Sequence, residues 1–229
     1  MWDVVDLGAK KGHAIDAFRR SRNQFFADDS PISPDRCLAI DRKIEYWGEL
    51  ESKGYKPLEL DLASDEAIAN LPEANYYLAW HFLEHVPSKE WSDKIVKAAL
   101  SKAKYGCWFV LPSFEPDTET GEGALRALGL RWSWSHWIGH PTHYLVQECK
   151  DAVNEWFDSE GENLEKGIQV RVLPSGGVTR DTNNHRVVFI DAPIDTTEHD
   201  PELEKGRGRK PLVHFDPPLI EEWSVVVRF

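Results

Sequence analysis

The chain has 229 residues, and its 41% hydrophobic and 29% charged residues suit one folded domain with an appendage. The net charge of −12 argues against a general nucleic-acid binder, because phosphate contacts need a basic surface. Its three cysteines form no CxxC pair, and no apolar run is long enough to cross a bilayer. We therefore expect a cytoplasmic protein with no signal peptide and no contact with membranes.

Strand-like and helix-like segments alternate along the first half of the chain. Short apolar strands are expected at 4–7, 37–40, 57–62, 75–80 and 105–112, with helical segments between them. Strands that alternate with helices at this spacing predict an α/β fold with a mostly parallel sheet and helices on both faces. With the later strands included, we expect a Rossmann-like sheet of about seven strands.

The second half has a different character. Residues 114–144 are rich in Trp, Gly and Pro and are expected to form a lid or acceptor-binding segment over the sheet. A helix is expected at 140–157, closing strands at 168–173 and 187–190, a linker at 195–210 and an apolar strand at 219–229. These boundaries predict one domain over 1–194 and a C-terminal extension, 195–229, that packs on it.

Acidic residues and glycines follow the first three predicted strands. The segment VVDLGAKKG (4–12) places Asp6 in the strand end and puts Gly8 and Gly12 in the turn that follows. Asp41 ends the second strand and Asp61 ends the third. Glycines allow a sharp turn and a close approach of backbone to ligand, and open α/β sheets bind ligands at the carboxyl ends of their strands.

These motifs, followed by WHFLEHVP (80–87), resemble the class I S-adenosylmethionine (SAM)-dependent methyltransferases over roughly residues 1–115. The resemblance implies a SAM site in which Asp6, Gly8 and Gly12 form the first motif. Lys10 stands where the family usually has another glycine. A lysine at this position could face the methionine carboxylate of SAM.

The remaining cofactor contacts are also implied by this resemblance. Asp41 would accept hydrogen bonds from both ribose hydroxyls, since an ionised carboxylate only accepts. Asp61 would receive the adenine amino group, with Leu62 packed on the adenine ring. Trp80 and His81 would lie beneath the sulfonium.

Four histidines are candidate proton acceptors for the chemical step: His81, His136, His140 and His143. Histidine suits this role because its pKa is near neutral. The alternative for the last three is a set of loop histidines that are hydrogen-bonded to backbone. The tryptophans at 132, 134 and 137 either line an acceptor pocket or pack the lid onto the sheet.

The spacing of His81, Glu84 and His85 is compatible with zinc on a helix. The family resemblance gives this segment a mainly structural place, so no metal is expected.

The function implied is transfer of a methyl group from SAM to an oxygen or nitrogen of a modest-sized acceptor, with a small molecule as the expected partner. The alternative is a non-catalytic SAM- or nucleoside-binding or interaction protein on the same fold. A dinucleotide oxidoreductase is a third interpretation, and the absence of GxGxxG spacing makes it the weakest.

Overall fold

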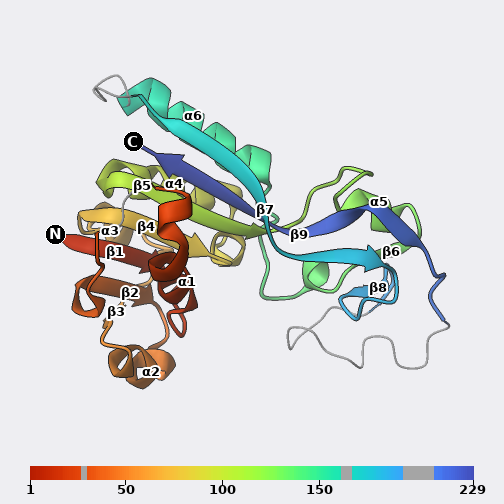
Figure 1. Cartoon of the computed structure of the whole chain (residues 1–229), viewed down its shortest axis with the longest axis horizontal. Helices are drawn as coiled ribbons and strands as arrows, with labels where there is room; N and C mark the ends of the chain where they lie inside the picture. The colour runs from red at the N-terminus through yellow and green to blue at the C-terminus, as the bar shows by residue number, and fades with distance from the viewer. Residues whose placement is uncertain (27–29, 161–166, 193–208) are drawn as a thin grey trace.

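Seven strands form the central sheet in the order β3-β2-β1-β4-β5-β9-β7 (Figure 1). The computed structural model describes residues 1–26, 30–160, 167–192 and 209–229. The strands are β1 Trp2–Leu7, β2 Cys37–Asp41, β3 Lys56–Glu59, β4 Ala74–Trp80, β5 Ala103–Pro112, β7 Gln169–Asp181 and β9 His214–Arg228. The first five are parallel, and β9 runs antiparallel to both β5 and β7. The predicted α/β architecture is confirmed.

Alternation along each strand produces a core on both faces of the sheet. In β1, Val4 belongs to one apolar cluster, while Val5 and Leu7 belong to the other. Helices α1 (His13–Ser21) and α2 (Trp47–Ser52) pack into the cluster that contains Val4. The opposite cluster is covered by α3 (Asp65–Ala69), α4 (Lys89–Lys102) and α6 (Val146–Glu160). Strands that are covered on both faces have nearly continuous apolar sequences, as β4 does.

A small lobe projects from the carboxyl edge of this sheet (Figure 1). It consists of α5 (Glu122–Arg126), the antiparallel pair β6 (Leu130–Trp132) and β8 (Val187–Phe189), and the distal ends of β7 and β9. Its own core includes Phe114, Leu125, Trp132, Val187 and Leu219. The long β7–β9 pair joins the two parts, because both strands run from the central sheet into the small lobe.

Three predicted elements differ from the structure. The segment 187–190 forms β8 and pairs with β6 in the small lobe, because β9 and β7 complete that side of the central sheet. The helix expected from His140 begins at Val146, because His140 precedes a proline, which disfavours helical backbone at that residue. The third strand ends at Glu59, since the Asp61 carboxylate turns the chain by accepting the Ala63 amide.

The linker expected at 195–210 lies, apart from Arg209 and Lys210, outside the described residues. Among the helices that are described, none combines the length and apolar character needed to cross a membrane.

Candidate functional site

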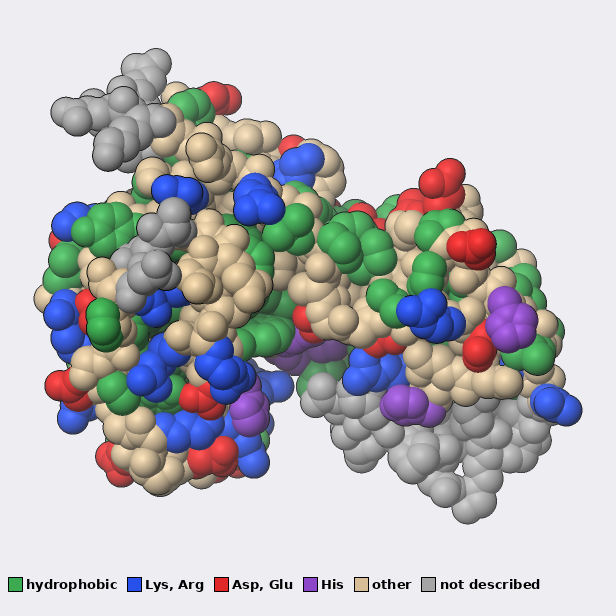
Figure 2. All heavy atoms as spheres, viewed as in Figure 1, with side chains coloured by type: hydrophobic (Ala, Val, Ile, Leu, Met, Phe, Trp, Pro, Cys, Tyr) green, Lys and Arg blue, Asp and Glu red, His purple; other side chains and the backbone are tan. Residues whose placement is uncertain are grey.

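A cavity of about 330 Å³ opens at the carboxyl ends of β1, β4 and β5, and is lined by both the central sheet and the small lobe. Figure 2 shows the hollow between these two parts, with histidine side chains at its base. The turn after β1 contributes Gly8 and Lys10, the end of β4 contributes Trp80, and the small lobe contributes Trp134 and Arg186. Carboxyl ends of parallel strands are where open α/β sheets bind ligands.

The Asp6 carboxylate lies at this cavity without a partner. Asp6 is 1% exposed, and neither of its oxygens accepts a hydrogen bond from the described residues. Burial, with the nearby charges of Asp41 and Asp16, raises the pKa of Asp6 well above its usual value. A buried carboxylate without a partner costs free energy, and a cation in the cavity would relieve that cost.

The turn after β1 requires glycine at two positions. Gly8 has φ of 71°, and a Cβ there would lie 2.3 Å from Cδ2 of Phe82. Gly12 has φ of 75° and begins α1. Lys10, the residue that departs from the expected glycine, also has a positive φ of 43°. The chain therefore keeps the glycine-like backbone despite the side chain.

Asp41 holds this turn to the end of β2. Its Oδ2 accepts the backbone N–H of Lys10 and its Oδ1 accepts that of Lys43, each at 2.9 Å. Each oxygen keeps a further lone pair for a ligand. Asp41 does not line the cavity itself, although Lys10, which is bonded to it, does.

Besides Asp41, three further predicted cofactor contacts lie away from the cavity lining. Gly12 is buried against Leu50 and Tyr55, and Asp61 is exposed on the surface. Leu62 is 4% exposed and packs in the core.

His81 follows β4 and occupies a left-handed backbone conformation, with φ of 51°. Non-glycine residues with this backbone cost about 1–3 kcal/mol and cluster at functional sites. The Nε2 of His81 lies 2.7 Å from Oε2 of Glu222, which pairs with Pro112 where β9 meets the end of β5. Burial alone would lower the pKa of His81, but the bond to Glu222 and the charge of Glu84 outweigh it and raise the pKa to about 9.

The other candidate histidines separate into two groups. His140 is buried and lines the cavity. His85, which is half-buried, also lines it. His136 is exposed, and the ring of His143 stacks on Phe114 with centroids 4.5 Å apart; neither lines the cavity.

Glu84 lies between these imidazoles and is fully buried. Burial alone would raise its pKa, but the neighbouring His81, His85 and His140 outweigh that effect and lower the pKa of Glu84. The oxygen Oε1 of Glu84 lies 4.0 Å from the Nε2 atoms of both His85 and His140. Of the described residues, Glu84, His85 and His140 form the group with the spacing to hold a metal ion.

The acidic pair on β9, Glu221 and Glu222, was not predicted from the sequence. Glu221 is buried, accepts a hydrogen bond from Thr179 Oγ1 at 2.8 Å and forms an ion pair with Arg186. Glu222 holds His81. The available signal was two adjacent acidic residues at the start of an apolar strand, where polar residues usually have a partner or a function.

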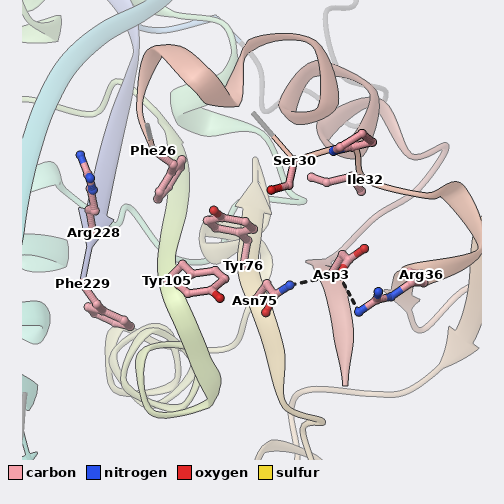
Figure 3. Close-up of a pocket in the computed structure, with 11 residues that line it drawn as sticks. Asp3, Phe26, Ser30, Ile32, Arg36, Asn75, Tyr76, Tyr105, Arg228 and Phe229 are labelled. Carbon is pink, nitrogen blue, oxygen red and sulfur yellow. Dashed lines mark hydrogen bonds and ion pairs between the residues drawn. The ribbon is translucent and has the colours of Figure 1, made fainter. Parts of the chain in front are cut away.

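A second cavity of about 440 Å³ lies at the opposite edge of the sheet (Figure 3). Its walls carry Asp3, Asn75 and Tyr105, which lie at the amino ends of β1, β4 and β5. Asp3 is already satisfied there, because its Oδ1 binds Arg36 at 2.8 Å and Asn75 at 3.0 Å (Figure 3). Among the described residues that line this second cavity, there is neither a glycine turn nor an unpartnered carboxylate like those of the first cavity.

Comparison with solved structures settles the fold. A SAM-dependent methyltransferase from Archaeoglobus fulgidus aligns with a TM-score of 0.56 at 14% identity, over 100% of this chain and 86% of that one. The chain has the class I methyltransferase fold. Magnesium protoporphyrin IX methyltransferase from Synechocystis PCC 6803, with bound S-adenosylhomocysteine (SAH), aligns at 0.51 and 9% identity, over 99% and 74% of the two chains.

A third relative of this methyltransferase fold is the small RNA methyltransferase HEN1, with a TM-score of 0.55 and 12% identity over 99% of this chain and 23% of that one. No protein-family model matches the sequence, and no curated protein sequence matches it.

Proposed function

We propose that this chain binds SAM in the 330 Å³ cavity and transfers its methyl group to an oxygen or nitrogen of a modest-sized acceptor. The observation that carries the proposal is the buried, unpartnered Asp6 carboxylate beside the Gly8 turn at the end of the central strand β1. SAM carries positive charge on its amino group and on its sulfur. Bound SAM would therefore supply the positive charge that the buried Asp6 carboxylate lacks. The solved relatives described as SAM-dependent or bound to SAH support the same cofactor.

The residues present fit SAM in two further ways. Gly8, Ala9 and Lys10 of the turn after β1 line the cavity, so the backbone of this turn can approach a ligand closely. Asp41 retains acceptor capacity on both oxygens, as a pair of ribose hydroxyls requires. When bound, SAM supplies a methyl group on a sulfur that is already a good leaving group.

The contribution of the protein is then mainly to orient the reactants and exclude water. Asp6 holds the amino group of the cofactor and Asp41 its ribose, and Trp134 of the small lobe lines the cavity. His140 is the proposed proton acceptor for a hydroxyl or amine. Its Nδ1 lies 2.9 Å from the Trp134 carbonyl, which can only accept, so Nδ1 carries a hydrogen and Nε2 is the atom that would take the proton.

The acceptor is proposed to be a small molecule bound against the small lobe. The net charge of −12 disfavours nucleic acid, and the cavity wall there carries Trp134 beside the charged residues Arg186, Glu221 and Glu222. The relatives named for a porphyrin and for small RNA act on very different acceptors, so the fold alone does not select one.

The test is a calorimetric titration of the purified protein with SAM, SAH and NAD. We expect saturable binding of SAM and SAH, and a loss of at least about tenfold in affinity in Asp41→Ala, because two hydrogen bonds to a charged acceptor are removed. Asp65→Ala removes an exposed carboxylate on α3 and should leave the affinity unchanged. A folded protein that binds NAD but neither SAM nor SAH would contradict the proposal.

A further inference from the structure

The carboxylate of Glu84 faces two imidazoles at a distance longer than a hydrogen bond. Glu84 is fully buried, and neither of its oxygens accepts a hydrogen bond from the described residues. The Nε2 atoms of His85 and His140 both lie 4.0 Å from Oε1, beyond hydrogen-bond range. Three ligand atoms thus converge within 4.8 Å of one another.

In each ring, the hydrogen bond made by Nδ1 determines that Nε2 faces Glu84. His85 Nδ1 lies 2.7 Å from the Gly139 carbonyl, and His140 Nδ1 lies 2.9 Å from the Trp134 carbonyl. A carbonyl only accepts, so each Nδ1 carries a hydrogen, and the Nε2 atom of each ring is the one that faces the carboxylate. Backbone carbonyls that orient metal-binding histidines in this way are typical of metal sites.

We propose that Glu84, His85 and His140 bind a divalent transition-metal ion such as Zn²⁺, Mn²⁺ or Co²⁺. Two imidazoles with a carboxylate suit these ions better than Mg²⁺ or Ca²⁺, which prefer oxygen ligands alone. An ion about 2.1 Å from each ligand holds tetrahedral ligand atoms about 3.4 Å apart, so the 4.0 Å separations would close by about half an ångström. This inference departs from the expectation of no metal drawn from the sequence.

The ligand set leaves open coordination positions on the side of the cavity. All three residues line the same cavity as Asp6 and Gly8. Three protein ligands with a free position are typical of catalytic metal sites rather than structural ones. His81, whose Nδ1 lies 3.4 Å from Oε1 of Glu84, borders the site.

The metal site also determines the class of methyl acceptor, and this step rests on the proposed function. Methylation of a hydroxyl by SAM breaks the methyl–sulfur bond, forms the methyl–oxygen bond of the ether, and yields SAH and one proton, which passes to bulk water. A metal ion that coordinates the hydroxyl oxygen lowers its pKa and so favours loss of that proton. The lone pair of His140 then holds the ion instead of accepting the proton, and the acceptor is a hydroxyl compound with an oxygen that can reach the ion.

The first test measures metal binding without SAM. Protein freed of metal with a chelator is titrated with Co²⁺, whose visible absorption reports its ligands, and metal content is checked by mass spectrometry. We expect one ion per chain, and affinity reduced by more than about 100-fold in Glu84→Gln and in His140→Ala, since loss of an outer-shell partner alone costs 10–100-fold. Circular dichroism confirms that each variant is folded.

His143→Gln is the matched control, because His143 is a neighbouring histidine that stacks on Phe114 outside the cluster. It should bind Co²⁺ as the unmodified chain does. If the unmodified chain binds none of Co²⁺, Zn²⁺ and Mn²⁺ at micromolar free ion, or if all variants bind alike, the metal site is wrong.

A second measurement separates this inference from the proposed function. Calorimetry with SAH on the chelator-treated protein reports the cofactor site alone. Metal binding without SAH binding would contradict the methyltransferase proposal and support the metal site. SAH binding without metal binding would support the cofactor site and contradict the metal site.

Discussion

Asp3 and Asp6 are both buried on β1, three residues apart, yet only Asp3 has partners. Asp3 binds Arg36 and Asn75, while both Asp6 oxygens lack a partner among the described residues. Buried polar groups are normally hydrogen-bonded, and exceptions need an explanation such as a ligand. The contrast within one strand supports the proposed role of Asp6 in binding.

Asp6→Asn is therefore expected to stabilise the protein while abolishing SAM binding. Because burial raises the folded-state pKa of Asp6, the native state holds a proton that the unfolded state releases above about pH 4. Stability of the unmodified chain should thus fall as pH rises from there to the raised pKa. Asp6→Asn has no carboxyl group to ionise. Its free energy of unfolding should therefore exceed that of the unmodified chain by a margin that grows with pH to about 1–3 kcal/mol.

Urea unfolding at pH 4 and pH 8 measures this difference. Asp3→Asn is the matched control and should lower stability by about 1 kcal/mol or less, since its Arg36 partner is half exposed. An Asp6→Asn variant less stable than the unmodified chain at pH 8 would mean that the carboxylate has a structural partner after all.

At the scale of single elements, the turn between β1 and α1 is the part of the site most constrained by its backbone. Gly8 combines a positive φ with direct contact to the Phe82 ring. Lys10 adopts the same class of backbone while its amide bonds to Asp41. The turn therefore depends on both strand ends, β1 and β2, being in place.

Gly8→Ala should lower the free energy of unfolding by about 1–3 kcal/mol, because it combines left-handed backbone strain with a steric clash. Differential scanning calorimetry measures the effect. Gly48→Ala on α2 is the matched control, since nothing lies within 4 Å of its Cβ, and it should be neutral or slightly stabilising. Equal effects at the two positions would refute the strained turn.

The β7–β9 pair anchors the small lobe through Glu221. This buried carboxylate accepts hydrogen bonds from Thr179 and Asn184 and pairs with Arg186. Its contacts join β7, β9 and the segment before β8, so they hold the small-lobe wall of the cavity in shape.

Arg186→Ala should destabilise the protein by about 1–3 kcal/mol, because it leaves a buried carboxylate without its ion-pair partner. Hydrogen exchange should show the loss first in β8 and in the distal half of β9. In a double-mutant cycle, Glu221→Gln should recover part of the loss, since the residue left buried is no longer charged. Additive effects would show that the two residues are not coupled.

At the scale of the whole molecule, the sequence predicted what depends on local order. Strand ends, the glycine turn, and the placement of Asp6 and Asp41 follow from the alternation of elements in the first half. The acidic pair on β9 could not be placed in this way, because His81 and Glu222 are 141 positions apart and meet only through strand order. The pairing of β6 with β8 in the small lobe was missed for the same reason, because it joins segments more than 50 residues apart.

The measurement that tests the account most directly is a crystal structure of the protein soaked with SAH. The account predicts ligand density in the 330 Å³ cavity, with the amino group within hydrogen-bond distance of Asp6 and the ribose hydroxyls at Asp41. Density instead in the cavity lined by Asp3 and Tyr105, or none at saturating SAH, would contradict it.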